Sequence, residues 1–147
     1  MRKLIVSLVV VMAICVVPVS AEEVERSQEA YLEAKAEIAS ATDTGRDLVD
    51  LYLKAAALTP NGWVRAWQLN NAAHVLIQMA DEKKGKNGLA DGKLIREALV
   101  LLGKAKPLSE AGMPLTEEGK AKWNSAAKTI EKNILYCERS LGLKAWD

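Results

Sequence analysis

Histidine and cysteine are scarce in this chain of 147 residues, which contains one histidine and two cysteines. With His74 as the single histidine and no CxxC or CxxCH motif, the sequence has no pattern for a zinc or haem site. It also has no nucleophile elbow or comparable signature of a catalytic nucleophile. We therefore predict no metal site, no cofactor and no catalytic residues, and hence a protein that is not an enzyme.

Long hydrophobic runs are also missing, except for one at the N-terminus. Two basic residues precede an apolar segment over 4–17, and Pro18 with small residues leads to Ala21 before a pair of glutamates. This order is that of a secretory signal peptide cleaved after Ala21. An uncleaved membrane anchor is the alternative, because the run approaches the roughly 18 to 20 apolar residues that span a bilayer.

Pro18 and the small residues after it favour cleavage over anchoring. The sequence thus predicts a signal peptide over 1–21 and a single mature domain over 22–147 that is not stably inserted in a membrane. Such a protein is exported to the periplasm or the cell exterior. Cys137 is then the one cysteine left, so an internal disulfide is excluded. A buried thiol is favoured over an exposed one that links two chains.

Neither sign of charge dominates the mature domain, which has 18 basic and 19 acidic residues once Arg2 and Lys3 are removed. A nucleic-acid-binding domain is normally strongly basic, so this class is excluded. The charges are nevertheless unevenly spread, because residues 22–50 are mainly acidic and residues 51–147 are mainly basic. The first helix could dock against a lysine-rich surface of the fourth, or that surface could be free to meet an acidic partner or a membrane. An ordinary solvated surface is favoured over both, because exposed lysines need no special explanation.

Alanine, leucine, lysine and glutamate are abundant, phenylalanine is absent, and no segment alternates as a strand does, so we predict an all-α fold. Caps, prolines and glycines divide the chain, with a mobile loop over Asp81–Gly92 and helices that pack as an antiparallel array or a bundle. The five predicted helices are Glu23–Ala41, Arg46–Leu58, Trp63–Ala80, Lys93–Lys106 capped by Asp91 and ending at Pro107, and a last helix capped by Thr116 that ends near Gly142.

The third and fifth helices carry the strongest apolar patterns. The third is apolar around more than half of its circumference and includes Trp63 and Trp67, which predicts a central position. The fifth has the cleanest stripe, in which Trp123, Ile130 and Cys137 recur at helical spacing. We expect Trp123 and Ile130 to hold this helix in the core.

Part of the chain resembles a family of helical repeats. The segment YLKAAALTPN over 52–61 looks like the second helix and exit turn of a tetratricopeptide repeat, and AWQLNNA over 66–72 resembles the opening helix of the next. The resemblance lies mainly in residues 48–75. It implies an array whose third and fifth helices face a concave surface that binds extended peptides.

Polar side chains on these two helices are the candidate binding residues. Asn70, His74 and Gln78 recur every four residues with Asn71 beside them, and the resemblance implies that Lys120, Asn124 and Lys128 face the same groove. Amide and ammonium groups suit the backbone or terminal carboxylate of a peptide. The alternative is that Asn70 and His74 bond to a neighbouring helix or reach solvent.

Two functions remain open from the sequence. One is an exported protein-binding or scaffold module with a tetratricopeptide-like groove, whose partner is another protein or a peptide. The other is a small helical ligand carrier or enzyme whose pocket is lined by Trp63, Trp67 and Trp123.

Cleavage of the signal peptide is directly testable. We expect the exported protein to begin at Glu22, because Val19 and Ala21 occupy the positions that the peptidase reads. Intact-mass measurement of the protein recovered from the exporting cell checks this. A mass that includes residues 1–21 would contradict it.

Overall fold

Five α-helices make up the part of the chain that the computed structural model describes, namely residues 21–41, 45–59, 62–85, 88–111 and 114–146, with side chains from residue 28 onward. No strand occurs in these ranges, so the predicted all-α fold is confirmed. No helix within them combines the length and apolar character needed to cross a membrane. The predicted signal peptide lies outside the described residues apart from Ala21, where the first helix begins. The helices are α1 (Ala21–Ser40), α2 (Arg46–Leu58), α3 (Gly62–Glu82), α4 (Gly92–Glu110) and α5 (Glu117–Ser140).

Side-chain caps begin two of the helices as predicted. The Asp91 carboxylate accepts hydrogen bonds from the backbone N–H groups of Lys93 at 2.9 Å and Leu94 at 3.4 Å. Thr116 Oγ1 accepts one from the N–H of Gly119 at 3.1 Å. These bonds satisfy N–H groups that have no partner inside the helix.

Gly142 ends α5 as expected. Its φ of 72° lies in the left-handed region that glycine adopts without strain. The N–H of Gly142 bonds to the carbonyl of Arg139 at 3.0 Å, and the N–H of Leu143 bonds to that of Glu138 at 2.8 Å. This pair of bonds is a Schellman motif, which satisfies the last carbonyls of the helix.

The predicted end of the fourth helix at Pro107 is wrong, because α4 continues to Glu110. Proline removes the bond to the carbonyl of Gly103 four residues earlier, but Gly103 is exposed and water can bond there. Leu108 packs against the core, and Ser109 is buried with its hydroxyl donating to the carbonyl of Lys106 at 2.7 Å. Packing of this last turn therefore outweighs the lost bond.

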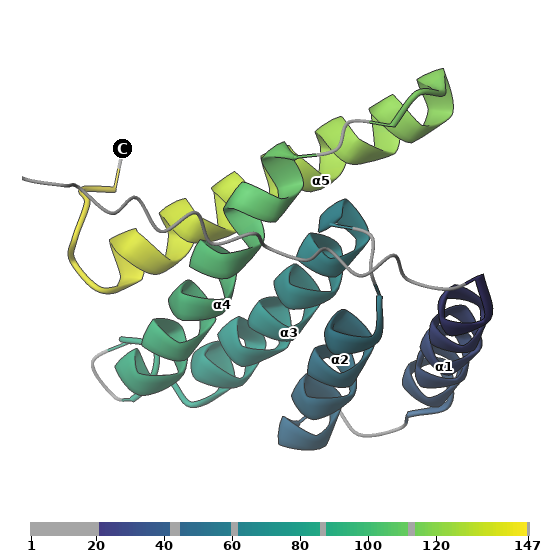
Figure 1. Ribbon diagram of the computed structural model, residues 1–147. Helices are drawn as coiled ribbons and strands as arrows, with labels where there is room; N and C mark the ends of the chain where they lie inside the picture. Colours follow the sequence, from purple (N-terminus) through teal and green to yellow (C-terminus); the bar gives the residue numbers. More distant parts are fainter. Residues whose placement is uncertain (1–20, 42–44, 60–61, 86–87, 112–113, 147) are drawn as a thin grey trace, which may run out of the picture.

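Consecutive helices run in opposite directions, and α1 to α4 form a row in which each packs against the next (Figure 1). α5 returns across α4 and also contacts α3. The prediction that the third helix is central is confirmed, because α3 packs against α2, α4 and α5. One of the alternatives that the charge pattern left open, docking of the first helix on the fourth, does not occur within the described chain. α1 packs against α2, whereas α4 lies at the other end of the row.

The core lies between α2, α3, α4 and α5. Small alanine side chains fill much of α3 and α4, which allows these helices to approach closely. The predicted burial of Cys137 is confirmed. The largest fully buried side chains are Val49, Leu76, Ile95, Leu102, Ile130 and Cys137.

The three tryptophans expected in or beside the core are only half-buried. Trp63, Trp67 and Trp123 lie outside the central cluster of buried residues. The placement of Trp123 in the core is therefore wrong, whereas that of Ile130 is confirmed. The indole Nε1 of Trp123 is buried and has no hydrogen-bond partner within the described chain.

Polar side chains also join helices that are far apart in sequence. Gln68 is buried, and its Nε2 donates to the Tyr31 hydroxyl on α1 at 2.9 Å. The Tyr136 hydroxyl on α5 donates to the Asp81 carboxylate at 2.7 Å, and burial together with this bond raises the pKa of Tyr136. Because buried polar groups must be paired, such bonds favour one alignment of the helices.

Substitutions on α5 distinguish its core residues from its partly exposed ones. Ile130→Ala should lower the free energy of unfolding by about 2–5 kcal/mol, because Ile130 is fully buried. Trp123→Phe should change it by less than about 1 kcal/mol, because phenylalanine keeps an aromatic ring and removes the unpartnered N–H. Chemical denaturation measures both. A larger loss for Trp123→Phe would mean that the indole N–H is hydrogen-bonded in solution.

Burial should also make the thiol of Cys137 unreactive. Removal from water raises the pKa of Cys137 to about 12, so at about pH 8 almost none is thiolate, the form that reacts with iodoacetamide. We expect no alkylation of the folded protein and complete alkylation in denaturant, measured by mass spectrometry. Rapid alkylation of the folded chain, or a disulfide-linked dimer, would show that Cys137 becomes accessible.

Candidate functional site

The candidate residues on α3 do not form one continuous edge. Asn70 is 2% exposed, and its Oδ1 accepts a hydrogen bond from Asn133 Nδ2 of α5 at 2.9 Å. His74 and Gln78 are exposed, and Asn71 is half-buried. A step of four residues advances about 40° around a helix with 3.6 residues per turn, so Asn70 faces α5 while Gln78 has turned to solvent.

Asn70 therefore joins two helices, which is the alternative that the sequence left open for it. Its side chain is not free for a ligand while the bond to Asn133 is made.

Two of the three candidate residues on α5 are exposed, and Lys120 is half-buried. Asn124 and Lys128 are exposed, and Lys120 forms an ion pair with Glu117 at 2.7 Å. None of the seven candidate residues lines the cleft between α3 and α5 that is described next.

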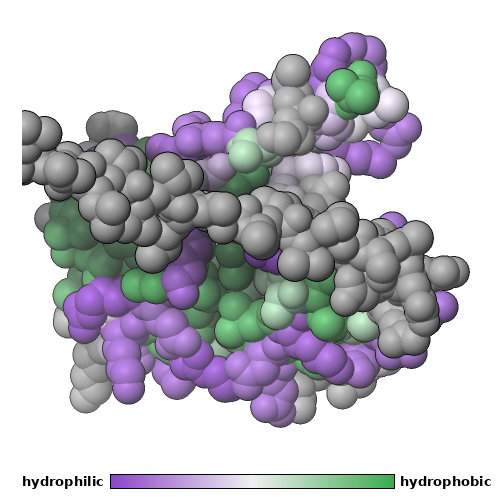
Figure 2. Space-filling view, in the orientation of Figure 1, coloured by the Kyte–Doolittle hydropathy of each residue, from purple (hydrophilic) through white to green (hydrophobic). Residues whose placement is uncertain are grey.

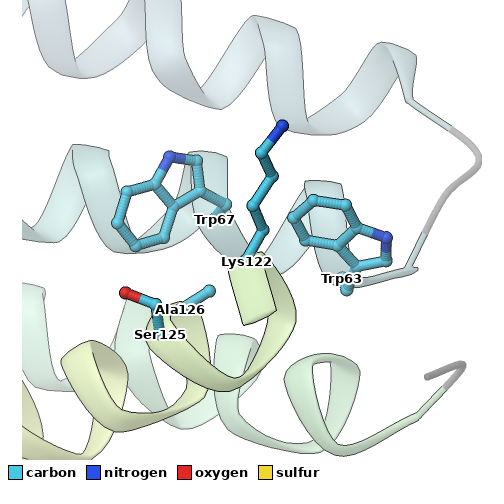
Figure 3. Close-up of a pocket in the computed structure, with 5 residues that line it drawn as sticks. All are labelled: Trp63, Trp67, Lys122, Ser125 and Ala126. Carbon is cyan, nitrogen blue, oxygen red and sulfur yellow. The ribbon is translucent and has the colours of Figure 1, made fainter. Parts of the chain in front are cut away.

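The cleft lies between the N-terminal halves of α3 and α5. It has a volume of about 320 Å³ and is lined by Trp63, Trp67, Lys122, Ser125 and Ala126 (Figure 3). The tryptophans are four residues apart on α3, and the other three lie within five positions on α5, so each set occupies one side of its helix. Further along, the Asn70–Asn133 bond holds the same two helices together.

The lining combines aromatic surface with a cation and a hydroxyl. In Figure 3 the aliphatic part of Lys122 lies between the two indole rings, and the Ser125 hydroxyl faces Trp67. The ammonium group forms an ion pair with Glu118 at 2.6 Å, and this hydrogen bond lowers the pKa of Glu118. Lys122 and Glu118 are both exposed, so the pair contributes little to stability and a ligand can replace it.

The surface around the cleft is polar on its α5 side. The projecting N-terminal half of α5 is mainly hydrophilic, whereas apolar residues gather over the body of the row (Figure 2). A ligand in the cleft would meet indole rings on the α3 side and Lys122, Ser125 and Ala126 on the α5 side.

Cys137 and His74 lie apart in the described structure. Cys137 is buried with its pKa raised, and His74 is exposed on another helix. Among the described residues, no three His, Cys, Asp or Glu side chains are grouped as metal ligands. The lining of the cleft includes the Ser125 hydroxyl and the Lys122 ammonium, which is held in an ion pair with Glu118.

Sequence reasoning found the helices that form the cleft but only part of its lining. Trp63 and Trp67 were expected to line a pocket together with Trp123, which is not part of the lining. Lys122 and Ser125 were missed. Lys122 is two positions from the candidate Lys120, and two residues turn a helix by about 200°. Only the packing of α5 against α3 and α4 decides which side faces the cleft.

Comparison with known proteins found no relative of this chain. No family model matches the chain, and no significant similarity was found to any curated protein or to any solved structure.

Proposed function

We propose that this protein is an exported, non-catalytic binding module whose cleft between α3 and α5 holds an extended segment of another protein. The observation that carries this proposal is the cleft lined by two half-buried tryptophans and a lysine. Tryptophan supplies a large rigid contact area, and such residues are enriched among those that dominate binding energies at protein interfaces.

The chemistry of the cleft suits a peptide. Indole faces pack against apolar side chains, Ser125 can bond to a peptide backbone, and Lys122 can pair with an acidic group once it leaves Glu118. The antiparallel order of the helices, with α3 and α5 on either side of one cleft, supports a tetratricopeptide-like array. The leader pattern over 1–21 supports export to the periplasm or exterior.

A small-molecule carrier is the second candidate. The observation that favours it is that Trp63 and Trp67 wall the same hollow. Its volume of about 320 Å³ lies at the lower end of the roughly 300–1,000 Å³ found for ligand pockets. Asn70 and His74, which would have supplied orienting hydrogen bonds, do not line it. An extended peptide needs no such enclosed pocket, so we favour the peptide.

Paired substitutions test the cleft. Trp67→Ala with Lys122→Gln should reduce capture of the partner from the envelope or secreted fraction at least ten-fold, because they remove an aromatic anchor and the cleft's cation. The matched control is Trp146→Ala with Lys132→Gln, which removes an exposed tryptophan and an exposed lysine outside the cleft. Quantitative mass spectrometry of cross-linked complexes measures the captured protein.

Two outcomes would contradict the proposal. Equal capture by the cleft variant and the control, with unchanged melting temperatures, would place binding elsewhere. Native mass spectrometry that shows a small molecule on the protein and none on the cleft variant would favour the carrier instead.

A further inference from the structure

The acidic and basic parts of this chain form opposite ends of the helical row. Most of the acidic segment folds as α1, and much of the basic character lies on α4. α1 packs mainly against α2 and is joined to α3 by the Tyr31–Gln68 hydrogen bond, while α4 packs against α3 and α5, so α2 and α3 separate the two (Figure 1). These two helices cannot neutralise each other within one folded chain.

The outer face of α1 presents one apolar side chain flanked by acidic ones. Tyr31, Ala34 and Ile38 face the protein, which leaves Glu29, Leu32 and Glu33 on the opposite side of the helix. Leu32 is 63% exposed, and both glutamates are exposed. Glu37, by contrast, already pairs with Lys54 of α2 at 2.8 Å and does not belong to this outer face.

The outer face of α4 likewise presents an exposed apolar side chain, but the charged residues around it are basic. Val100 is 58% exposed and is flanked by the exposed Lys93, Arg96 and Lys104. Glu97, the acid on this helix nearest to them, pairs with Arg46 of α2. The outer face of α4 therefore keeps a net positive charge.

A groove of about 460 Å³ adjoins Val100. It is lined by Arg96, Leu99 and Val100 of α4 and by Leu141 and Leu143 at the end of α5. Leu143 is 65% exposed, so this groove presents apolar side chains to solvent with a cation at its edge. Exposed apolar patches rimmed by charge are typical of protein interaction sites.

We propose that the outer face of α1 in one copy of this protein docks on the outer face of α4 in a second copy, with Leu32 entering the groove. Glu29 and Glu33 then lie opposite Lys93, Arg96 and Lys104. The occupant is a second copy because one chain carries both complementary surfaces. The outer face of α1 has an apolar side chain flanked by acids, and the outer face of α4 adjoins an apolar groove flanked by bases.

The processed chain has 18 basic and 19 acidic residues once Arg2 and Lys3 are removed, and this near-zero net charge allows such an approach without overall repulsion. The contact is heterologous, since the two faces differ, and it leaves one free face at each end. Copies can therefore add in a row. Because the paired charges lie at the solvent-exposed rim, salt should weaken the association strongly.

Neutralised variants test this arrangement independently of the cleft. All proteins are expressed with residues 1–21 included and purified after natural processing. One variant combines Glu29→Gln with Glu33→Gln, and the other combines Lys93→Gln, Arg96→Gln and Lys104→Gln. Analytical ultracentrifugation should show the unaltered protein growing in mass with concentration at low salt and returning to a monomer at about 0.5 M salt, where screening reaches only a few ångströms.

Each variant alone should associate at least about ten-fold more weakly, since several interface charges are lost. An equimolar mixture should form a dimer and nothing larger, because the intact α4 face of the first variant meets the intact α1 face of the second. Glu110→Gln with Glu131→Gln, and Lys83→Gln with Lys132→Gln, are controls that remove exposed charges elsewhere and should associate like the unaltered protein.

Three results would overturn the proposal. They are a monomer at every concentration, association of the α1 and α4 variants that equals that of the controls, or a mixture that stays monomeric. Salt-sensitive binding of the monomer to vesicles of anionic lipid, lost in the α4 variant alone, would assign this face to a membrane instead.

Discussion

Burial of α3 on several sides is the packing on which the rest of the structure depends. Its buried residues include Ala66, Ala72, Ala73 and Ala80, whose small side chains allow α2, α4 and α5 to approach it. The sequence has no phenylalanine, and Cys137, the cysteine within the described residues, is a free thiol, so the described part of the chain gains its stability from many close aliphatic contacts. The helices around α3 also position the other features. α5 supplies half of the cleft, α2 holds α1 at one end of the row, and α4 itself forms the other end.

Polar residues buried on α3 restrict how its neighbours align. Gln68 bonds to Tyr31 of α1, and Asn70 bonds to Asn133 of α5. A slide of either neighbour by one residue would leave a buried amide without a partner, at a cost of roughly 1–3 kcal/mol. The Asn70–Asn133 bond thus positions α5 so that Lys122, Ser125 and Ala126 face Trp63 and Trp67. An asparagine that sequence reasoning placed in the binding groove instead supports the helix that forms the cleft.

Local signals in the sequence predicted most of the fold. The α2 helix has the predicted bounds, the caps at Asp91 and Thr116 are formed, and Gly142 ends α5. These features depend on residues close in the chain. Pro107 shows the limit of such local signals. The last turn of α4 continues past this proline because Leu108 and Ser109 pack against the rest of the protein.

The candidate site was harder to predict for the same reason. A helix pattern gives the spacing of side chains, but which side faces a cleft depends on how two helices meet. Trp123 follows the apolar stripe of α5 and is still only half-buried, whereas Lys122 beside it lines the cleft. Sequence alone contains no signal for which side of α5 meets α3.

The cleft and the two end faces use separate surfaces. The cleft is formed by the N-terminal halves of α3 and α5, whereas the proposed contact between copies uses the outer faces of α1 and α4. Occupation of one does not cover the other, so each copy added to a row would present one more cleft. Clefts linked in this way raise the effective concentration of binding sites for a partner with several matching segments. Because salt screens the contacts between copies, it would weaken that combined binding more than binding to a single cleft.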